Sequence, residues 1–289
     1  MALTRGFDSL THLLTGSATV AAIVISQSVA VHAKTGEEVY QIAVPVTVQI
    51  NSDMGGGTGV IIAQDDNSAA AFVNRGLARY YLKDYQGAIS DFDKALKIDP
   101  NYAAAYNNRG NARANLKDYQ GAISDYDKAI KIDPNFAIAY VNRGSARLDL
   151  KDYQGAISDY DKALKIDPND ADAYFNRGLA RYYLKDYQGA ISDFDKALKI
   201  DPNYAAAYNN RGNARNNLKD YQGAISDYDK ALKIDPNYAD AYLNRGVALY
   251  MVGDKRKARG DWETGAQLYR QQGNEDDYKD AMDNLRNFK

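Results

Sequence analysis

The stretch NYAAAYNNRGNARANLKDYQGAISDYDKAIKIDP, residues Asn101–Pro134, recurs with small changes along most of the 289-residue chain. A glycine returns every 34 residues from Gly76 to Gly246, and a proline keeps the same step from Pro100 to Pro236. A fixed period of this length, with two short apolar segments in each unit, is the signature of stacked helical repeats. The sequence therefore predicts an all-α solenoid built from one repeated helix-turn-helix motif.

Each unit is expected to contain two amphipathic helices. In residues 101–134, Tyr106 and Gly110 fall at helical spacing, and a second apolar set does so from Ala122 to Ile130. Between the two sets, Asp118 is placed to accept hydrogen bonds from free backbone N–H groups at the start of the second helix. Because neither helix can bury its apolar face alone, neighbouring units must stack.

The small and aromatic positions of this unit resemble the tetratricopeptide repeat (TPR) pattern. Its aromatic, glycine, alanine, aromatic, alanine and proline positions are filled here by Tyr106, Gly110, Ala122, Tyr126, Ala129 and Pro134. The resemblance implies a right-handed superhelical solenoid of six repeats: 67–100, 101–134, 135–168, 169–202, 203–236 and a divergent 237–270. The sixth keeps Trp262 but has Gly265 in place of the second alanine.

The last segment, residues 271–289, is expected to form a capping helix. Tyr278, Ala281, Met282, Leu285 and Phe288 fall on one helical face, and the opposite face is polar. A solenoid needs a terminal element of this kind to cover its exposed end.

The first 33 residues have the features of a secretory signal peptide. Arg5 gives a basic start, Ala18–Val31 is an apolar stretch, and Val31-His32-Ala33 fits a small-x-small cleavage site. The stretch is shorter than the roughly 20 continuous apolar residues of a membrane span. We therefore expect an exported bacterial protein, periplasmic or secreted, without stable membrane insertion after cleavage. An uncleaved N-terminal anchor is the alternative.

Residues 34–66 differ in composition from the repeats. β-Branched residues alternate from Val44 to Ile50, glycines follow at Gly55–Gly59, and Val60–Ile62 forms a second apolar run, which together predict a β-hairpin. The segment resembles the first two strands of trypsin-like serine peptidases, truncated before any catalytic residue. The alternatives are a hairpin that caps the solenoid and a strand that pairs with another chain, giving self-association.

The sequence argues against catalysis. Both histidines, His12 and His32, lie in the predicted signal peptide, and there is no cysteine. Nucleophile–base pairs and the usual zinc ligands are therefore missing from the mature chain. No Gly-Lys-Ser/Thr follows Gly55–Gly59, so a phosphate-binding loop is not expected. With a net charge of −2 and no basic stripe, nucleic-acid binding is not expected. We expect a non-enzyme without cofactor or metal.

The predicted binding surface comes from the resemblance, because the first helix of each TPR lines the concave groove. An asparagine stands two residues before every repeat glycine, and two repeats carry further asparagines on the same face: Asn74, Asn108, Asn111, Asn115, Asn142, Asn176, Asn210, Asn213, Asn217 and Asn244. A carboxamide offers a donor and an acceptor, so such a row can pair with an extended peptide. The alternative is that these residues are simply polar and solvent-facing, and partly identical because a three-repeat block was duplicated.

Tyrosines alternate with these amides along the predicted groove. Tyr80, Tyr81, Tyr182 and Tyr183 are candidate peptide-binding residues, since tyrosine gives contact area at low entropic cost. Most other tyrosines fall at packing positions and are expected in the core. Arg109 and Arg113 are expected to pair with Asp125 of the second helix, with a ligand-facing role as the alternative.

These features predict a protein–protein interaction scaffold that binds an extended peptide or protein partner in the groove. The alternative is a catalytically inactive, truncated or regulatory relative of a secreted trypsin-like protease–TPR fusion.

Overall fold

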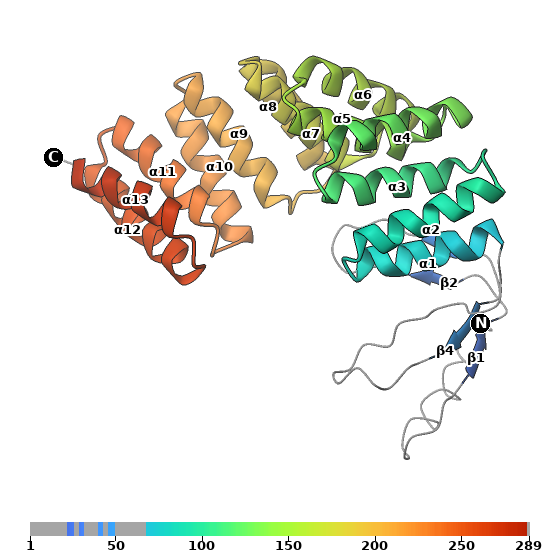
Figure 1. Ribbon diagram of the computed structural model, residues 1–289. Coiled ribbons are helices and arrows are strands. Elements are labelled where there is room, and N and C mark those ends of the chain that lie inside the picture. Colours follow the sequence, from blue (N-terminus) through green and yellow to red (C-terminus); the bar gives the residue numbers. More distant parts are fainter. Residues whose placement is uncertain (1–21, 26–28, 32–39, 43–45, 50–67, 288–289) are drawn as a thin grey trace, which may run out of the picture. The chain divides into compact units, whose positions relative to one another are not determined.

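A computed structural model describes residues 22–25, 29–31, 40–42, 46–49 and 68–287 of the protein (Figure 1). Helices dominate the described residues, alternating with short turns. Their bounds are α1 Ala69–Tyr81, α2 Tyr85–Ile98, α3 Ala103–Asn115, α4 Tyr119–Ile132, α5 Ala137–Asp149, α6 Tyr153–Ile166, α7 Ala171–Tyr183, α8 Tyr187–Ile200, α9 Ala205–Asn217, α10 Tyr221–Ile234, α11 Ala239–Met251, α12 Lys255–Gln271 and α13 Glu275–Asn287. The predicted fold class is confirmed: consecutive helix-turn-helix repeats follow one another along the chain.

The second helix of each repeat begins at an aspartate cap. Asp118 Oδ1 accepts a hydrogen bond from the backbone N–H of Gly121 (3.0 Å), as the sequence predicted. A Cβ atom on Gly121 would lie only 2.1 Å from Asp118 Oδ2. Glycine at this position therefore lets the carboxylate reach the free N–H groups of the first turn.

The first helix ends in a left-handed residue that is not glycine. Lys117 has φ 63°, and its backbone N–H donates to Ala114 O (2.8 Å), while Asp118 N donates to Arg113 O (2.9 Å). A lysine with φ between 62° and 64° stands at this position in each of the first five repeats, whereas the sixth has Gly253 at φ 88°. Because a Cβ disfavours this region, each lysine costs on the order of 1 kcal/mol relative to glycine.

The core of each repeat is an aromatic ring pressed onto the repeat glycine. Tyr126 of α4 is 2% exposed, and a Cβ on Gly110 of α3 would lie 2.5 Å from its Cε1 atom. Ala105, Ala112, Ala122 and Ala129 around it are fully buried. The ring positions of the other repeats are filled by Phe92, Tyr160, Phe194, Tyr228 and Trp262. The predicted roles of the small and aromatic residues are therefore confirmed.

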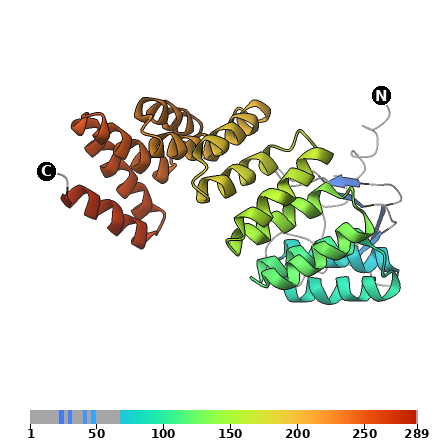
Figure 2. The ribbon, with the colours of Figure 1, turned by 90° about the horizontal axis from the view of Figure 1, so that it is seen from above.

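The chain divides into two compact bodies, residues 1–132 and 133–289. The first contains α1–α4 and the second α5–α13, and Figure 2 shows the paired helices within each. Within each body, the first helices of neighbouring repeats contact one another more extensively than the second helices do, as α9 and α11 illustrate. The first helices therefore line the inner face of each stack.

Helix α13 packs on α12 at the end of the second body. Ala281 is fully buried in a cluster with Ala266 and Tyr269, and Tyr278 and Met282 pack against it. Leu285 contacts the neighbouring cluster around Trp262. The predicted Phe288 contact lies outside the described residues.

The described residues before α1 form four short strands. β1 (Ala22–Ile25) pairs antiparallel with β4 (Val46–Gln49), and β2 (Val29–Val31) pairs antiparallel with β3 (Tyr40–Ile42). β4 lies in the first predicted strand, while the second, Val60–Ile62, lies outside the described residues, as do His32 and Ala33 of the predicted cleavage site. The signal peptide and the role of residues 34–66 therefore stay predictions.

Candidate functional site: an amide pocket on the inner face

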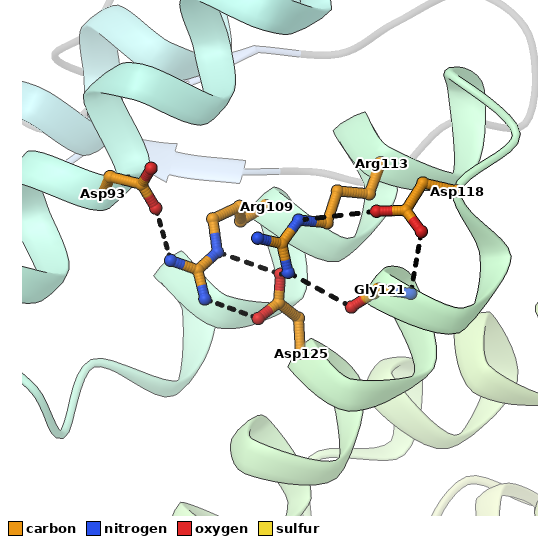
Figure 3. Close-up of polar contacts among 6 residues, drawn as sticks. All are labelled: Asp93, Arg109, Arg113, Asp118, Gly121 and Asp125. Atoms are coloured by element: carbon orange, nitrogen blue, oxygen red, sulfur yellow. Dashed lines mark hydrogen bonds and ion pairs between the residues drawn. The ribbon is translucent and has the colours of Figure 1, made fainter.

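A buried ion network holds the first helix of each repeat against the second. Arg109 donates from Nε to Asp125 Oδ2 (2.9 Å) and from Nη2 to Asp125 Oδ1 (2.5 Å), and Arg113 Nη1 donates to Asp125 Oδ2 (2.7 Å). Asp125 is fully buried, and Figure 3 shows both guanidinium groups converging on it. The two arginines are thus engaged within the repeat, as predicted, rather than facing a ligand.

The same network links successive repeats. Arg109 Nη1 also donates to Asp93 of the preceding repeat, and Arg211 Nη1 makes the equivalent bond to Asp195 (2.5 Å). Burial alone would lower the pKa of Arg109, but its bonds to Asp125 and Asp93 raise that pKa overall. The guanidinium therefore stays charged and ties the first helix of its repeat to the second helix of the preceding repeat, α3 to α2 and α9 to α8.

The asparagines two residues before each glycine do not form a uniformly exposed row. Asn108 is only 5% exposed, and the Nδ2 atom of Asn74 is buried with no hydrogen-bond partner among the described residues. Asn210 Nδ2 donates to Ala206 O (2.9 Å), and Asn244 Nδ2 donates to Asn209 Oδ1 (3.1 Å). Asn142 and Asn176 are half-buried. Each position thus differs in how much of its amide remains for a ligand.

The second set of asparagines binds tyrosines of the chain itself. Tyr126 OH donates to Asn111 Oδ1 (2.8 Å), and Asn115 Nδ2 donates to Tyr80 OH of the preceding repeat (2.9 Å). The duplicated block repeats both bonds, from Tyr228 to Asn213 (2.8 Å) and from Asn217 to Tyr182 (3.1 Å). The amide and tyrosine patches predicted separately are therefore bonded to each other, which leaves only part of their hydrogen-bonding capacity for a partner.

The remaining candidate tyrosines are exposed. Tyr81 and Tyr183 are 52% and 54% exposed. Tyr183 stacks on Tyr153, with ring centroids 5.1 Å apart, and contacts Tyr182 edge-on. These rings present apolar area at the ends of α1 and α7.

A polar pocket of about 290 Å³ opens between α9, α11 and α12 in the second body. It brings together three of the predicted site residues, Asn210, Asn213 and Asn244. Its other lining residues were not predicted: Asn209, Tyr238, Asp240, Leu243 and Tyr269. We call this cavity the amide pocket.

Two of the missed residues carried a signal in the sequence. Asn209 is 4% exposed at a position where four repeats have an apolar residue (Val73, Val141, Phe175 and Leu243) and the second repeat has the buried Asn107. Asp240 stands where three repeats have alanine and one has isoleucine, and only the fourth repeat has another aspartate, Asp172. Each residue thus departs from what most repeats have at its position, and the pocket is lined by both departures together.

Asp240 supplies the negative charge of the amide pocket. Its Oδ1 atom accepts a hydrogen bond from Tyr269 OH. Burial, and to a lesser extent the nearby carboxylate of Asp240, raises the pKa of Tyr269 and the pKa of Tyr238. Both phenols are therefore neutral at physiological pH, and the described lining of the pocket includes no lysine or arginine. The site combines amide groups, two neutral phenols and one carboxylate.

A second cavity, of about 450 Å³, lies between α12 and α13 and contains none of the predicted site residues. In the described part of the chain, no helix is both long and apolar enough to cross a membrane. The same residues include no group of three or more histidine, cysteine, aspartate or glutamate side chains that could hold a metal ion. Of the two cavities, only the amide pocket contains predicted site residues.

Models of the tetratricopeptide repeat match most of the helical region. One matches residues 69–102, 103–136 and 171–204, a second matches 125–158 and 194–226, and a TPR repeat model matches 144–184 and 212–253. Together the matches run from residue 69 to 253, more than half of the chain. None of these models reaches residues 34–66, so the peptidase resemblance stays a prediction. No curated protein sequence matches the chain significantly.

Solved structures share the fold. MamA is 26% identical, with a TM-score of 0.54 over 57% of this chain and 96% of MamA. YrrB, described as a TPR protein with an unusual peptide-binding site, is 24% identical, with a TM-score of 0.53 over 61% of this chain and 91% of its own. The pilF protein of Pseudomonas aeruginosa is 21% identical, with a TM-score of 0.64 over 75% and 97%. The last two likenesses show the fold alone.

Proposed function

Because the chain belongs to the tetratricopeptide repeat family, we propose that it is a non-enzymatic scaffold that binds an extended segment of a partner protein along the inner face of its first helices. Stacked helical repeats typically present extended concave surfaces for partners. A segment in extended conformation exposes alternating C=O and N–H groups, which carboxamides can pair with on both sides.

The amide pocket is the observation that carries this proposal. Asn213 Oδ1 is bonded to Tyr228, which leaves its Nδ2 atom without a partner among the described residues. Asn210 is the converse case, because its Nδ2 atom is bonded to Ala206 O and its Oδ1 atom is left to accept. A donor and an acceptor in one pocket are what a peptide group of a bound segment requires. YrrB, a fold relative with a described peptide-binding site, agrees with this use of the fold.

The test is selection of binders from a displayed library of random peptides on the full-length protein. Affinities of the selected peptides are then measured by fluorescence anisotropy for the wild type, for Asn210→Ala and for Asn203→Ala. Asn203 is the matched control, since it is exposed in the turn between α8 and α9. Loss of one hydrogen bond worth about 0.5–1.5 kcal/mol predicts roughly twofold to thirteenfold weaker binding for Asn210→Ala only. Recovery of no binding peptide would refute the proposal.

We also propose that the scaffold works after export from the cytoplasm. The support is the sequence of the first 33 residues, with Arg5, the apolar stretch and the Val31-His32-Ala33 site. Intact-mass spectrometry of protein purified from its native host tests this, with a mature chain beginning at Lys34 as the expected result. A full-length mass would contradict cleavage.

A further inference from the structure

We propose that the amide pocket receives a positively charged lysine or arginine side chain of the bound segment, with Asp240 as its counter-ion. This inference rests on the proposed function and adds the chemical class of the partner residue. It goes beyond peptide backbone recognition, because it makes the pocket selective for side-chain charge.

The charge balance of the pocket is the first support. Among the described residues that line it, Asp240 is the only charged one. It lies in the first turn of α11, where the helix dipole favours a negative charge. Arg245 on the same helix is already bonded to Asp229 and Asp261. The pocket therefore holds a carboxylate with no cation of its own, which favours a cationic ligand.

The amide orientations are the second support. Asn210 and Asn244 both spend their Nδ2 atoms on protein acceptors, Ala206 O and Asn209 Oδ1. Their Oδ1 atoms are left as acceptors in the same pocket as the Asp240 carboxylate. An ammonium has three donors and a guanidinium has five, and neither has an acceptor. A set of oxygen acceptors beside one carboxylate thus matches the head of a lysine or arginine.

The apolar part of the lining suits the stem of such a side chain. Tyr238, Leu243 and Tyr269 border the pocket, and lysine and arginine stems pack their methylene groups against such surfaces. The protein already uses this pairing elsewhere: Lys128 Nζ lies 5.4 Å from the centre of the Tyr106 ring. The rings of Tyr238 and Tyr269 are therefore suitable neighbours for a cation.

The experiment is a double-mutant cycle on the full-length protein with peptides selected from the random library. Each selected peptide is compared with a version in which its lysine is replaced by norleucine or its arginine by citrulline, which removes the charge and keeps the stem. Both versions are measured on the wild type and on Asp240→Asn, which can still accept a hydrogen bond from Tyr269. Because Asp240 is solvent-exposed, its ion pair is expected to contribute at most about 1 kcal/mol. Removal of the peptide charge should therefore weaken binding about twofold to fivefold on the wild type. On Asp240→Asn the same replacement is expected to have almost no effect.

Asp172→Asn is the matched control. Asp172 occupies the equivalent position in α7 and also accepts a hydrogen bond from a tyrosine, Tyr204 (2.8 Å), but it does not line the amide pocket. Removal of the peptide charge should weaken binding to this variant as much as to the wild type. If peptides bind but lack basic residues, or lose equal affinity on the wild type and Asp240→Asn, this inference is overturned and the proposed function stands. If no peptide binds, both are overturned.

Discussion

Replacing Asp125 by alanine should be among the most damaging single changes in the first body. Asp125 is fully buried and binds Arg109 twice and Arg113 once. The alanine variant keeps both guanidinium groups, and the Arg109 side chain is only 11% exposed. Removing one partner of a buried ion pair leaves uncompensated charge and typically costs about 3–5 kcal/mol. We expect a loss of this size in the free energy of unfolding.

The neighbouring carboxylate provides a matched comparison. Asp93 also binds Arg109, but its side chain is 44% exposed. An ion pair with an exposed partner contributes at most about 1 kcal/mol, so Asp93→Ala should cost far less than Asp125→Ala. Replacing Arg109, Arg113 and Asp125 together by Met, Met and Leu should recover most of the stability, since apolar residues of similar volume often match a buried ion network.

Urea denaturation followed by circular dichroism gives the free energies, and hydrogen exchange of the α3 and α4 amides locates the change. Exchange is needed because a repeat protein can open locally without unfolding throughout. Equal, small losses for Asp125→Ala and Asp93→Ala would refute the assignment of the network as a buried structural element. A loss confined to residues outside α3 and α4 would also contradict it.

Three further changes test the packing and the turns. Gly110→Ala should cost about 1–3 kcal/mol of stability because the new Cβ would overlap the Tyr126 ring at 2.5 Å. Gly260→Ala, whose new Cβ would have no described atom within 4 Å, should instead stabilise α12 by up to about 1 kcal/mol. Thermal unfolding measures both changes, and a change of the same sign in both variants would contradict the packing. Lys117→Gly should stabilise by up to about 1 kcal/mol, because it relieves the left-handed φ of 63° as Gly253 does in the sixth repeat; a destabilised variant in urea titration would argue against this. Burial raises the pKa of Tyr126 well above its usual 10.0, so the stability that the neutral phenol contributes is complete below pH 10 and is lost as pH rises above that value. Tyr126→Phe should therefore reduce the fall of the unfolding free energy at alkaline pH. An unchanged dependence on pH would show that other groups cause the fall.

Much of the fold could be predicted from the sequence because each repeat signals it locally. The 34-residue period, the capping aspartate Asp118 and the small residues opposite Tyr126 each depend on positions within one helix pair. The pairing of Arg109 with Asp125 was also foreseeable, since a charge on a packed helix face needs an opposite charge within reach. Repetition then applied the same reasoning to every repeat.

The candidate site was only partly predictable. The asparagine pattern identified Asn210, Asn213 and Asn244, which the structure gathers in one pocket. It did not show that Asn108 is buried, or that Asn111 and Asn115 are bonded to Tyr126 and Tyr80. Helical spacing indicates which face a residue occupies, but its exposure depends on side chains of the next repeat.

The sequence by itself determined the repeat, the capped start of the second helix and the buried ion pairs, because those follow from contacts between residues fewer than about 20 positions apart. Only the tertiary structure decided which amides remain available and that Tyr269 meets Asp240, 29 positions earlier in the chain. Stacking brings α9, α11 and α12 together at the amide pocket. The hydrogen bonds formed there between repeats leave some amide groups for a ligand and engage the others.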